Sequence, residues 1–172
     1  ELRRDFSNVG LALQAYLRRS ATDVARLAQT GANFRLCKGI YIEPRRIAYK
    51  DAHIVRMNYT RLLDMMLAKG CYVGIATHDE RLVWEAIRLT ETYAVARDHF
   101  EFQMLLGVDE ELRRILIEAG YRLRVYVPFG EEWYAYSVRR MKENPALAGQ
   151  VFRNLVRSFV PGFREREPVR TG

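Results

Sequence analysis

The feature that most constrains the fold is a regular alternation of short apolar runs with longer amphipathic stretches. The first run, at residues 9–16, is too short for a typical helix and is apolar on both faces, which is typical of a parallel strand covered on both sides. Five runs are predicted to be strands, at residues 9–16, 33–39, 71–77, 100–105 and 121–127. Alternation with short connections predicts parallel strands joined by right-handed crossovers, and therefore an α/β fold.

Helices are predicted between and after these strands from apolar residues at helical spacing. The predicted ranges are 22–30, with a cap at Thr22 and Asp23, then 51–69, 79–93, 109–119 and 131–144. A further helix at 146–159 is predicted to pack on the body of the protein, the alternative being a basic helix on a membrane surface. We expect one unit over residues 1–160 and an unstructured tail over residues 161–172.

Polar residues recur where the predicted strands end, and in a TIM-like (βα)8 barrel that edge carries the active site. These residues are Gln14, Lys38, Thr77, His78, Gln103 and Tyr126. Five units do not close an eight-unit barrel, so we expect about three βα units, on the order of a hundred residues, to precede Glu1. An open doubly wound sheet is the alternative, although the sequence lacks the Gly-rich phosphate turn that is usual in that fold.

The composition narrows the expected partners and compartment. The formal net charge is +7, yet the 28 Lys and Arg are scattered among 21 Asp and Glu rather than gathered in blocks. No nucleic-acid module signature accompanies this charge, so no nucleic acid is expected as a partner. Cys37 and Cys71 lie in apolar runs without metal-type spacing, which indicates reduced thiols. Since no apolar run approaches the roughly 20 residues that span a bilayer, we expect a cytoplasmic protein with at most a peripheral membrane contact.

The stretch from residue 125 to residue 144 is predicted to be a strand, a turn and a helix. With Tyr136 at zero, Arg140 lies at about +40° and Arg139 at about −60° around the helix, so the two guanidinium groups flank one line. Glu143 lies one turn beyond Arg139 and can hold that guanidinium in place. Such a pair can bind a small carboxylate through charge-assisted hydrogen bonds, and the alternative is a solvated basic surface.

Further candidates come from the strands themselves. Alternation would place Arg35 inside a strand and Lys38 near its end. A buried arginine needs an anion, so Arg35 either forms a salt bridge with Glu101 or binds a ligand. Lys38 would be the Schiff-base former if the protein were a (βα)8 lyase, which is the rival enzyme hypothesis. His78 ends another strand, and a lone histidine there is more often hydrogen-bonded and structural than catalytic.

Several common catalytic arrangements are absent from the sequence. The three histidines share no metal-ligand spacing, so a zinc site is not expected. Neither a Gly-x-Ser-x-Gly elbow nor a Walker loop occurs. Gln14, Gln103 and Thr77 offer neutral donors and acceptors, which suit a polar heterocycle better than acid–base turnover.

Five short motifs occur in order, with a βα unit between each and the next. They are Leu13-Gln14-Ala15-Tyr16, Arg35-Leu36-Cys37-Lys38-Gly39-Ile40-Tyr41, Ala76-Thr77-His78, Phe100-Glu101-Phe102-Gln103-Met104-Leu105, and Tyr126-Val127-Pro128-Phe129-Gly130 followed by Tyr136 and Arg139-Arg140. The series covers about residues 9–144 and resembles the FAD-dependent proline dehydrogenase family. The resemblance implies a distorted (βα)8 barrel that holds FAD at the carboxyl ends of the strands, with strands four to eight present here.

The resemblance also implies a role for each matched residue. FAD would contact Gln14, Arg35, Lys38, Thr77 and His78, with Gln14 and Arg35 at the isoalloxazine ring. L-Proline would be bound by Arg139, Arg140, Glu143, Tyr126, Tyr136, Leu105 and Tyr41, the two arginines holding its carboxylate and, with Tyr126, acting as the catalytic residues. The implied reaction is oxidation of L-proline to Δ1-pyrroline-5-carboxylate by hydride transfer to flavin N5, with electrons passed to a membrane quinone.

The sequence departs from the family pattern at two positions. Asp79 stands where the family often has asparagine, and Ile42 where the longer bifunctional members carry tryptophan. The family's active-site lysine and aspartate belong to earlier strands and are not located in this chain. The lack of an aldehyde-dehydrogenase region favours a monofunctional member, and Tyr126 favours proline over hydroxyproline. The alternative outside enzymes is a basic binding module.

Overall fold

A computed structural model of the chain describes residues 2–6, 8–127 and 130–131. The strands are β1 (Gly10–Gln14), β2 (Asn33–Cys37), β3 (Val73–Ala76), β4 (Phe100–Leu105) and β5 (Leu123–Tyr126). The helices are α1 (Leu2–Asp5), α2 (Ser20–Leu27), α3 (Ala52–Leu67), α4 (Glu80–Thr92) and α5 (Glu110–Glu118), and a 3-10 turn, η1 (Ala28–Thr30), follows α2. All five predicted strands and the predicted helices up to residue 119 are therefore present.

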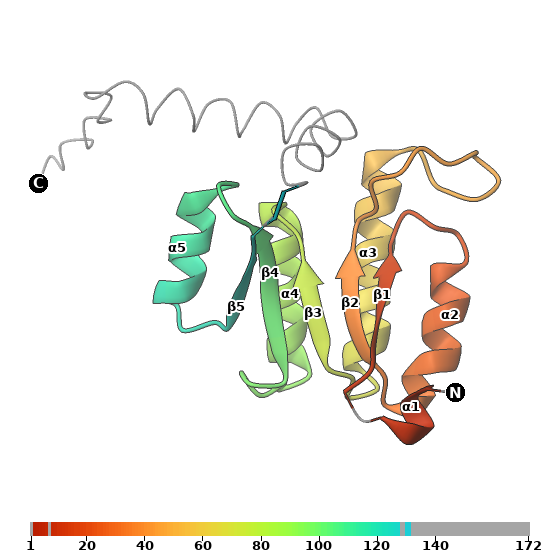
Figure 1. Cartoon of the computed structure of the whole chain (residues 1–172), viewed down its shortest axis with the longest axis horizontal. Helices are drawn as coiled ribbons and strands as arrows, with labels where there is room; N and C mark the ends of the chain where they lie inside the picture. Colours follow the sequence, from red (N-terminus) through yellow and green to blue (C-terminus); the bar gives the residue numbers. More distant parts are fainter. Residues whose placement is uncertain (1, 7, 128–129, 132–172) are drawn as a thin grey trace, which may run out of the picture.

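The strands form one parallel sheet in the order β1-β2-β3-β4-β5, with all arrowheads at the same edge (Figure 1). The order follows the chain, so these five strands contain no switch point of the kind that defines a doubly wound sheet. Successive right-handed crossovers in one direction place every connecting helix on the same face. The doubly wound alternative is therefore wrong for the described strands.

The two faces of the sheet differ in polarity. One row of neighbouring residues across the strands, Leu13, Leu36, Ile75, Phe102 and Leu123, is apolar and belongs to the core cluster or packs against it. The next row toward the carboxyl ends, Gln14, Cys37, Ala76, Gln103 and Arg124, lies on the opposite face because side chains alternate along a strand. The expectation that residues 9–16 form a strand covered on both faces is wrong, because Gly10, Leu11 and Ala12 of β1 are exposed.

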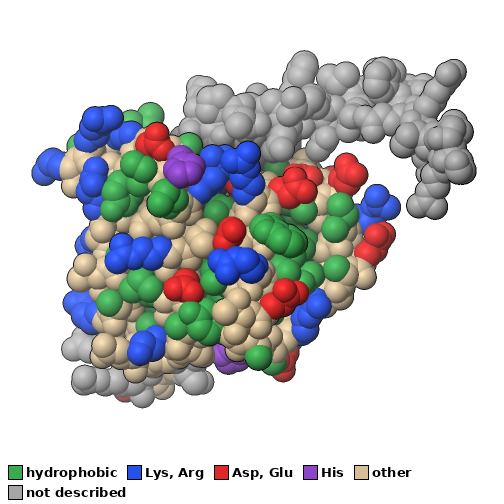
Figure 2. All heavy atoms as spheres, turned by 180° about the vertical axis from the view of Figure 1, so that it is seen from behind, with side chains coloured by type: hydrophobic (Ala, Val, Ile, Leu, Met, Phe, Trp, Pro, Cys, Tyr) green, Lys and Arg blue, Asp and Glu red, His purple; other side chains and the backbone are tan. Residues whose placement is uncertain are grey.

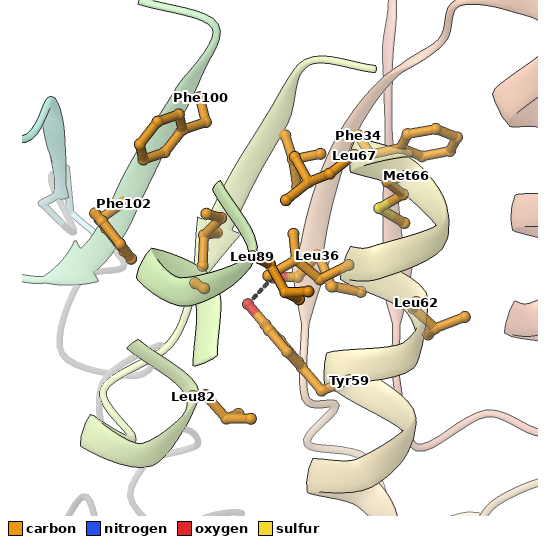
Figure 3. Packing of buried hydrophobic residues seen from close by; sticks show 14 of the residues in the cluster. Phe34, Leu36, Tyr59, Leu62, Met66, Leu67, Leu82, Leu89, Phe100 and Phe102 are labelled. Atoms are coloured by element: carbon orange, nitrogen blue, oxygen red, sulfur yellow. Dashed lines mark hydrogen bonds between the residues drawn. The ribbon is translucent and has the colours of Figure 1, made fainter. Parts of the chain in front are cut away.

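Helix α3 supplies much of the core that covers the apolar face. Tyr59, Leu62 and Met66 are fully buried on it, and Figure 3 shows the Tyr59 side chain reaching toward Leu36 of β2. Full burial of side chains of this size stabilises the fold by about 1.5–3 kcal/mol each. The Tyr59 hydroxyl donates a hydrogen bond to the Leu36 carbonyl oxygen at 3.0 Å, and this bond also fixes the position of α3 along β2.

The helix starts follow local capping chemistry. The Asp51 carboxylate accepts hydrogen bonds from the backbone N–H groups of His53 and Ile54 at 2.8 and 3.0 Å, which begins α3 one residue later. The cap predicted at Thr22 and Asp23 is wrong, because α2 already begins at Ser20. Asp23 instead pairs with Arg19 one turn earlier at 2.7 Å.

The outer surface mixes charges of both signs. Figure 2, which views the molecule from behind, shows Lys and Arg side chains interspersed with Asp and Glu rather than gathered in one basic field. Pairs within one helix contribute to this pattern, for example Arg88 with Glu85 at 2.9 Å. Within the described ranges no helix is long and apolar enough to cross a membrane.

Some of the expected elements lie outside the described residues. They are most of the helix predicted at 131–144, the helix predicted at 146–159 and the tail at 161–172. Their expected packing stays a prediction.

Gly39, directly after β2, offers a test of how tightly this edge is built. Its φ is +110°, and a Cβ added there would lie 2.1 Å from the Tyr16 ring. Gly70 is the matched control, because its φ is +64° and a Cβ would meet nothing within 4 Å. We expect Gly70→Ala to cost about 1 kcal/mol of unfolding free energy through backbone strain alone. Gly39→Ala should cost roughly 2–4 kcal/mol because the ring must also move.

Urea unfolding of the two variants in the complete protein measures the difference. Equal losses would contradict the close contact between Gly39 and Tyr16.

Candidate functional site

The carboxyl edge of the sheet gathers polar side chains from four consecutive strands. The contributing residues are Gln14 of β1, Lys38 after β2, Thr77 and His78 after β3, and Gln103 of β4. Because all strands are parallel, these ends meet on one side of the molecule, as the arrowheads in Figure 1 show. The predicted gathering of polar strand ends is therefore confirmed for these residues.

Arg35 is held by groups from its own strand and from a strand two positions away. Its Nε donates to Gln103 Oε1 at 2.6 Å, and its Nη1 donates to Cys37 Sγ at 3.0 Å. The predicted salt bridge to Glu101 is wrong, because Arg35 reaches Glu101 only through the Gln103 amide. Arg35 is also exposed rather than buried, since the face on which it lies is not covered by any described helix.

Glu101 is the buried charge of this face, with only 3% of its surface exposed. It accepts hydrogen bonds from Arg124 Nε at 2.7 Å, from Arg124 Nη2 at 3.0 Å and from Gln103 Nε2 at 2.7 Å. Burial alone would raise the pKa of Glu101, but the hydrogen bonds from Arg124 and Gln103 outweigh burial and lower the pKa. The carboxylate is therefore ionised at neutral pH and acts only as an acceptor.

The lack of a side chain at Gly74 makes the contact across β3 feasible. Gly74 is the partner of Arg35 on one side and of Glu101 on the other in the strand register. A Cβ at position 74 would lie 2.5 Å from Gln103 Nε2. Any larger residue would therefore displace the amide that links β2 to β4.

A second charged cluster lies at the ends of β2 and β3. Asp79 Oδ2 is 2.6 Å from Arg56 Nε and 3.1 Å from Lys38 Nζ. Burial would raise the pKa of Asp79, but the hydrogen bond from Arg56 and the charge of Lys38 outweigh burial and lower the pKa. The Asp79 backbone N–H donates to Thr77 Oγ1 at 3.1 Å, which fixes the turn that leads into α4. The partly buried Asp79 carboxylate thus holds Lys38 at the edge of the sheet.

His78 links the exits of β3 and β4. Its Nε2 accepts a hydrogen bond from the Leu105 backbone N–H at 2.8 Å, so the neutral ring carries its proton on Nδ1. Burial, more than any nearby charge, lowers the pKa of His78 to about 4. The ring is therefore neutral at physiological pH, in agreement with the predicted structural role.

The remaining substrate-side candidates lie at the rim or outside the described residues. Tyr126 ends β5 with 48% of its surface exposed, Tyr41 lies in the β2–α3 connection with 50% exposed, and Leu105 ends β4 half-buried. The other four, Tyr136, Arg139, Arg140 and Glu143, lie outside the described residues. The predicted grouping of both arginines with Tyr126 stays a prediction.

Sequence reasoning missed two partners at this edge. Arg56 belongs to α3 and Arg124 to β5, and each neutralises a carboxylate of another element. The only sequence signal for Arg124 is a basic residue on the polar face of a strand adjacent to one that carries Glu101. In the part of the chain that the structure describes, no group of three or more His, Cys, Asp or Glu could hold a metal ion.

The lowered pKa of His78 predicts a pH-dependent stability. In the unfolded chain the ring takes a proton near its ordinary value of 6.5, whereas the folded ring does so only near 4. The stabilisation by neutral His78 is thus complete above pH 6.5 and is lost as the pH falls toward 4. Between neutral pH and about pH 5 the unfolding free energy should fall by on the order of 2 kcal/mol from this group.

Urea unfolding of the complete protein as a function of pH measures this loss. His78→Gln keeps an acceptor for the Leu105 N–H but cannot titrate, so it should flatten the pH dependence, whereas the exposed His53→Gln should not. Equal pH dependence in wild type and His78→Gln would contradict the buried neutral ring.

Comparison with known proteins places the chain in a family. The sequence model described as proline dehydrogenase matches residues 1–153. Proline dehydrogenase of Deinococcus radiodurans is 43% identical over 150 residues, covering 87% of this chain and 48% of that protein. Proline dehydrogenase 1 of Bacillus subtilis is 34% identical over 157 residues, covering 91% of this chain and 52% of that protein. The chain spans about half the length of the curated relatives it matches.

A solved structure agrees with the sequence match. Proline utilization A (PutA) from Bdellovibrio bacteriovorus, inactivated by N-propargylglycine, superposes with a TM-score of 0.67 at 28% identity, covering 85% of this chain and 16% of that chain. Sequence motifs, strand order and both comparisons therefore agree, and the chain belongs to the proline dehydrogenase family.

Proposed function

We propose that the complete protein oxidises L-proline to Δ1-pyrroline-5-carboxylate with FAD as its cofactor and passes the electrons to a quinone. The observation that carries this proposal is the family match over residues 1–153, which includes every polar strand end described above. L-Proline as substrate is supported by the two relatives, which are proline dehydrogenases of 43% and 34% identity.

The architecture supports a catalytic barrel that is completed by a preceding segment. A sheet in sequential order with all crossovers in one direction is the arrangement of strands in a (βα)8 barrel. The polar face of β1 to β5 would then line the barrel interior, and this chain would supply strands four to eight. Three earlier βα units would cover the face that the described helices leave open, and would contribute the further active-site residues expected of the family.

The residues at the carboxyl edge fit a flavin. A planar heterocycle needs a floor without bulky side chains, and the central strand offers Ala76 on the polar face, while the space over Gly74 is taken by the Gln103 amide. It also needs neutral hydrogen-bonding groups, which Gln14 and Thr77 can supply, and His78 stays neutral at physiological pH. The exposed guanidinium of Arg35 adds a nearby cation, which would stabilise the reduced, anionic form of the ring.

When bound, FAD would accept the hydride that leaves the proline ring carbon beside nitrogen. The chain's own residues supply placement and electrostatics. Arg35 would stabilise negative charge on the cofactor, and Gln14 would hydrogen-bond the ring edge. Lys38 would lie near the cofactor, with its ammonium group paired to the Asp79 carboxylate. Family members with asparagine in place of Asp79 would lack this ion pair.

The substrate would be held between rim residues and the following helix. Arg139 and Arg140 would bind the proline carboxylate, and Glu143 would orient one of their guanidinium groups. Tyr136 would pack against the pyrrolidine ring of proline. Leu105, Tyr41 and Tyr126 lie at the rim where the ring would contact them. Orientation of this kind lowers the barrier by removing rotational and translational freedom before the reaction.

Two alternatives lose their support. A Schiff-base lyase needs a free neutral amine, whereas Lys38 Nζ is engaged with the Asp79 carboxylate at 3.1 Å. A basic binding module would present a field of one sign, whereas the face seen in Figure 2 mixes both signs. The quinone acceptor, a peripheral contact with a membrane and a cytoplasmic location remain part of the proposal.

The proposed carboxylate clamp gives a test of the substrate. Changing Arg139 or Arg140 to methionine keeps much of the apolar stem but removes charge-assisted hydrogen bonds worth roughly 1.5–3 kcal/mol. The kcat/KM for proline should therefore fall by about ten- to a hundredfold or more in either variant. FAD content and melting temperature should remain close to those of the wild type.

Pyrrolidine, which lacks the carboxylate, is the control substrate. It should be poor for the wild-type protein and lose little more in either variant. If proline and pyrrolidine oxidation fall by the same factor, the arginines act on the fold or the cofactor and not on the substrate carboxylate.

A further inference from the structure

A line of hydrogen bonds crosses the polar face from β2 to β5 and involves four side chains. Arg124 of β5 donates twice to Glu101 of β4, Gln103 of β4 donates to Glu101, and Arg35 of β2 donates to Gln103. Each step is between 2.6 and 3.0 Å. The line ends at the guanidinium that faces the open side of the sheet.

We propose that Glu101 is a positioning residue, which sets the orientation of the Arg35 guanidinium through the amide of Gln103. Glu101 lies near the middle of β4 and contacts Arg35 only through Gln103. The inference rests on the proposed function in one respect, namely that Arg35 acts on the flavin.

The chemistry of the three groups fixes the direction of the amide. An ionised carboxylate only accepts hydrogen bonds, so Gln103 must turn its NH2 group toward Glu101. Its Oε1 then faces the other way, toward Arg35 Nε at 2.6 Å. If Glu101 were neutral or absent, Arg35 alone would favour this direction of the amide, and no acceptor would hold the NH2 end in place.

The ion pair with Arg124 keeps the Glu101 carboxylate ionised, so that it can only accept hydrogen bonds. Both oxygens of the Glu101 carboxylate are bonded to this one guanidinium, at 2.7 and 3.0 Å. A buried carboxylate without such a partner would be unstable in its charged form. The side chain of Arg124 is 69% exposed while that of Glu101 is 4% exposed, so the pair joins an exposed guanidinium to a buried carboxylate.

The geometry leaves one edge of Arg35 for a ligand. Gln103 Oε1 accepts a hydrogen bond from Arg35 Nε, and Cys37 Sγ accepts one from Arg35 Nη1. No residue that the structure describes accepts a hydrogen bond from Arg35 Nη2. A guanidinium fixed by Nε can rotate less about its last side-chain bonds, so its free edge keeps one direction. Such fixed donors stabilise developing negative charge better than mobile ones do.

Three variants of the complete protein separate positioning from other roles. Glu101→Gln replaces a carboxylate, which can only accept, by an amide of nearly the same shape that is uncharged and whose NH2 group can also face Gln103. Gln103→Met removes the link but leaves the Glu101–Arg124 pair intact, which guards against a variant that fails to fold. Glu85→Gln is the matched control, because this carboxylate pairs with Arg88 on the surface of α4.

Hydrogen exchange of the Arg35 Nε–H, followed by nitrogen-15 NMR, reports the positioning without any flavin. Loss of its hydrogen bond should speed exchange by about tenfold in Glu101→Gln and in Gln103→Met, and not in Glu85→Gln. Unchanged exchange in both Glu101→Gln and Gln103→Met would overturn the proposal, whatever the protein binds.

The midpoint potential of the flavin gives a second readout, because the two possible effects of Glu101→Gln shift this potential in opposite directions. Removing a negative charge near the flavin would by itself raise the potential, since reduction adds negative charge. Loss of a positioned Arg35 should instead lower it, and the same lowering is expected of the reference variant Arg35→Met. We therefore expect Glu101→Gln to lower the potential in the wild-type background, and not to lower it when Arg35 is already methionine.

The outcomes keep this inference apart from the proposed function. A raised potential in Glu101→Gln, or a lowering that persists in the Arg35→Met background, would overturn the positioning role. An Arg35→Met protein with wild-type potential would contradict the role of Arg35 at the flavin, while the exchange measurement would still decide whether Glu101 positions Arg35.

Discussion

The polar face of this sheet depends on the ion pair between Glu101 and Arg124. A carboxylate that is only 3% exposed would be unfavourable without a partner that binds both of its oxygens. Arg124 can reach it only if β5 lies beside β4 in the observed register, in which Gln103 and Arg124 are neighbours. The same contact therefore fixes an edge of the sheet and turns the Gln103 amide toward Arg35.

The apolar face of the sheet packs against the helices and stabilises the fold, while the polar face carries the candidate site. Helices α3 and α4 bury the apolar face, and their packing does not use the polar side chains of the other face. The polar face can therefore keep an exposed arginine and a glycine in a central strand, both of which would weaken a strand selected for stability alone. This division is the one expected of a barrel that carries its chemistry at the carboxyl edge of the strands.

Periodicity in the sequence was sufficient for the five strands, their order of appearance and the gathering of polar strand ends. It failed where the outcome depends on neighbours from other elements. A salt bridge between Arg35 and Glu101 is one of the two interpretations that the sequence allows, but the register places Gly74 between them, and the longer Gln103 side chain fills that gap. Asp79 was noted only as a departure from the family pattern, and its pairing with Arg56 follows from how α3 packs, which no local pattern encodes.

The most direct test of the account is an anaerobic titration of the purified complete protein with L-proline, followed by visible absorbance. If the polar face of β1 to β5 forms a flavin site beside a proline site, the protein will carry FAD and its yellow absorbance will bleach as proline is added. A protein that folds but binds no flavin, or a bound flavin that proline leaves oxidised, would contradict the account.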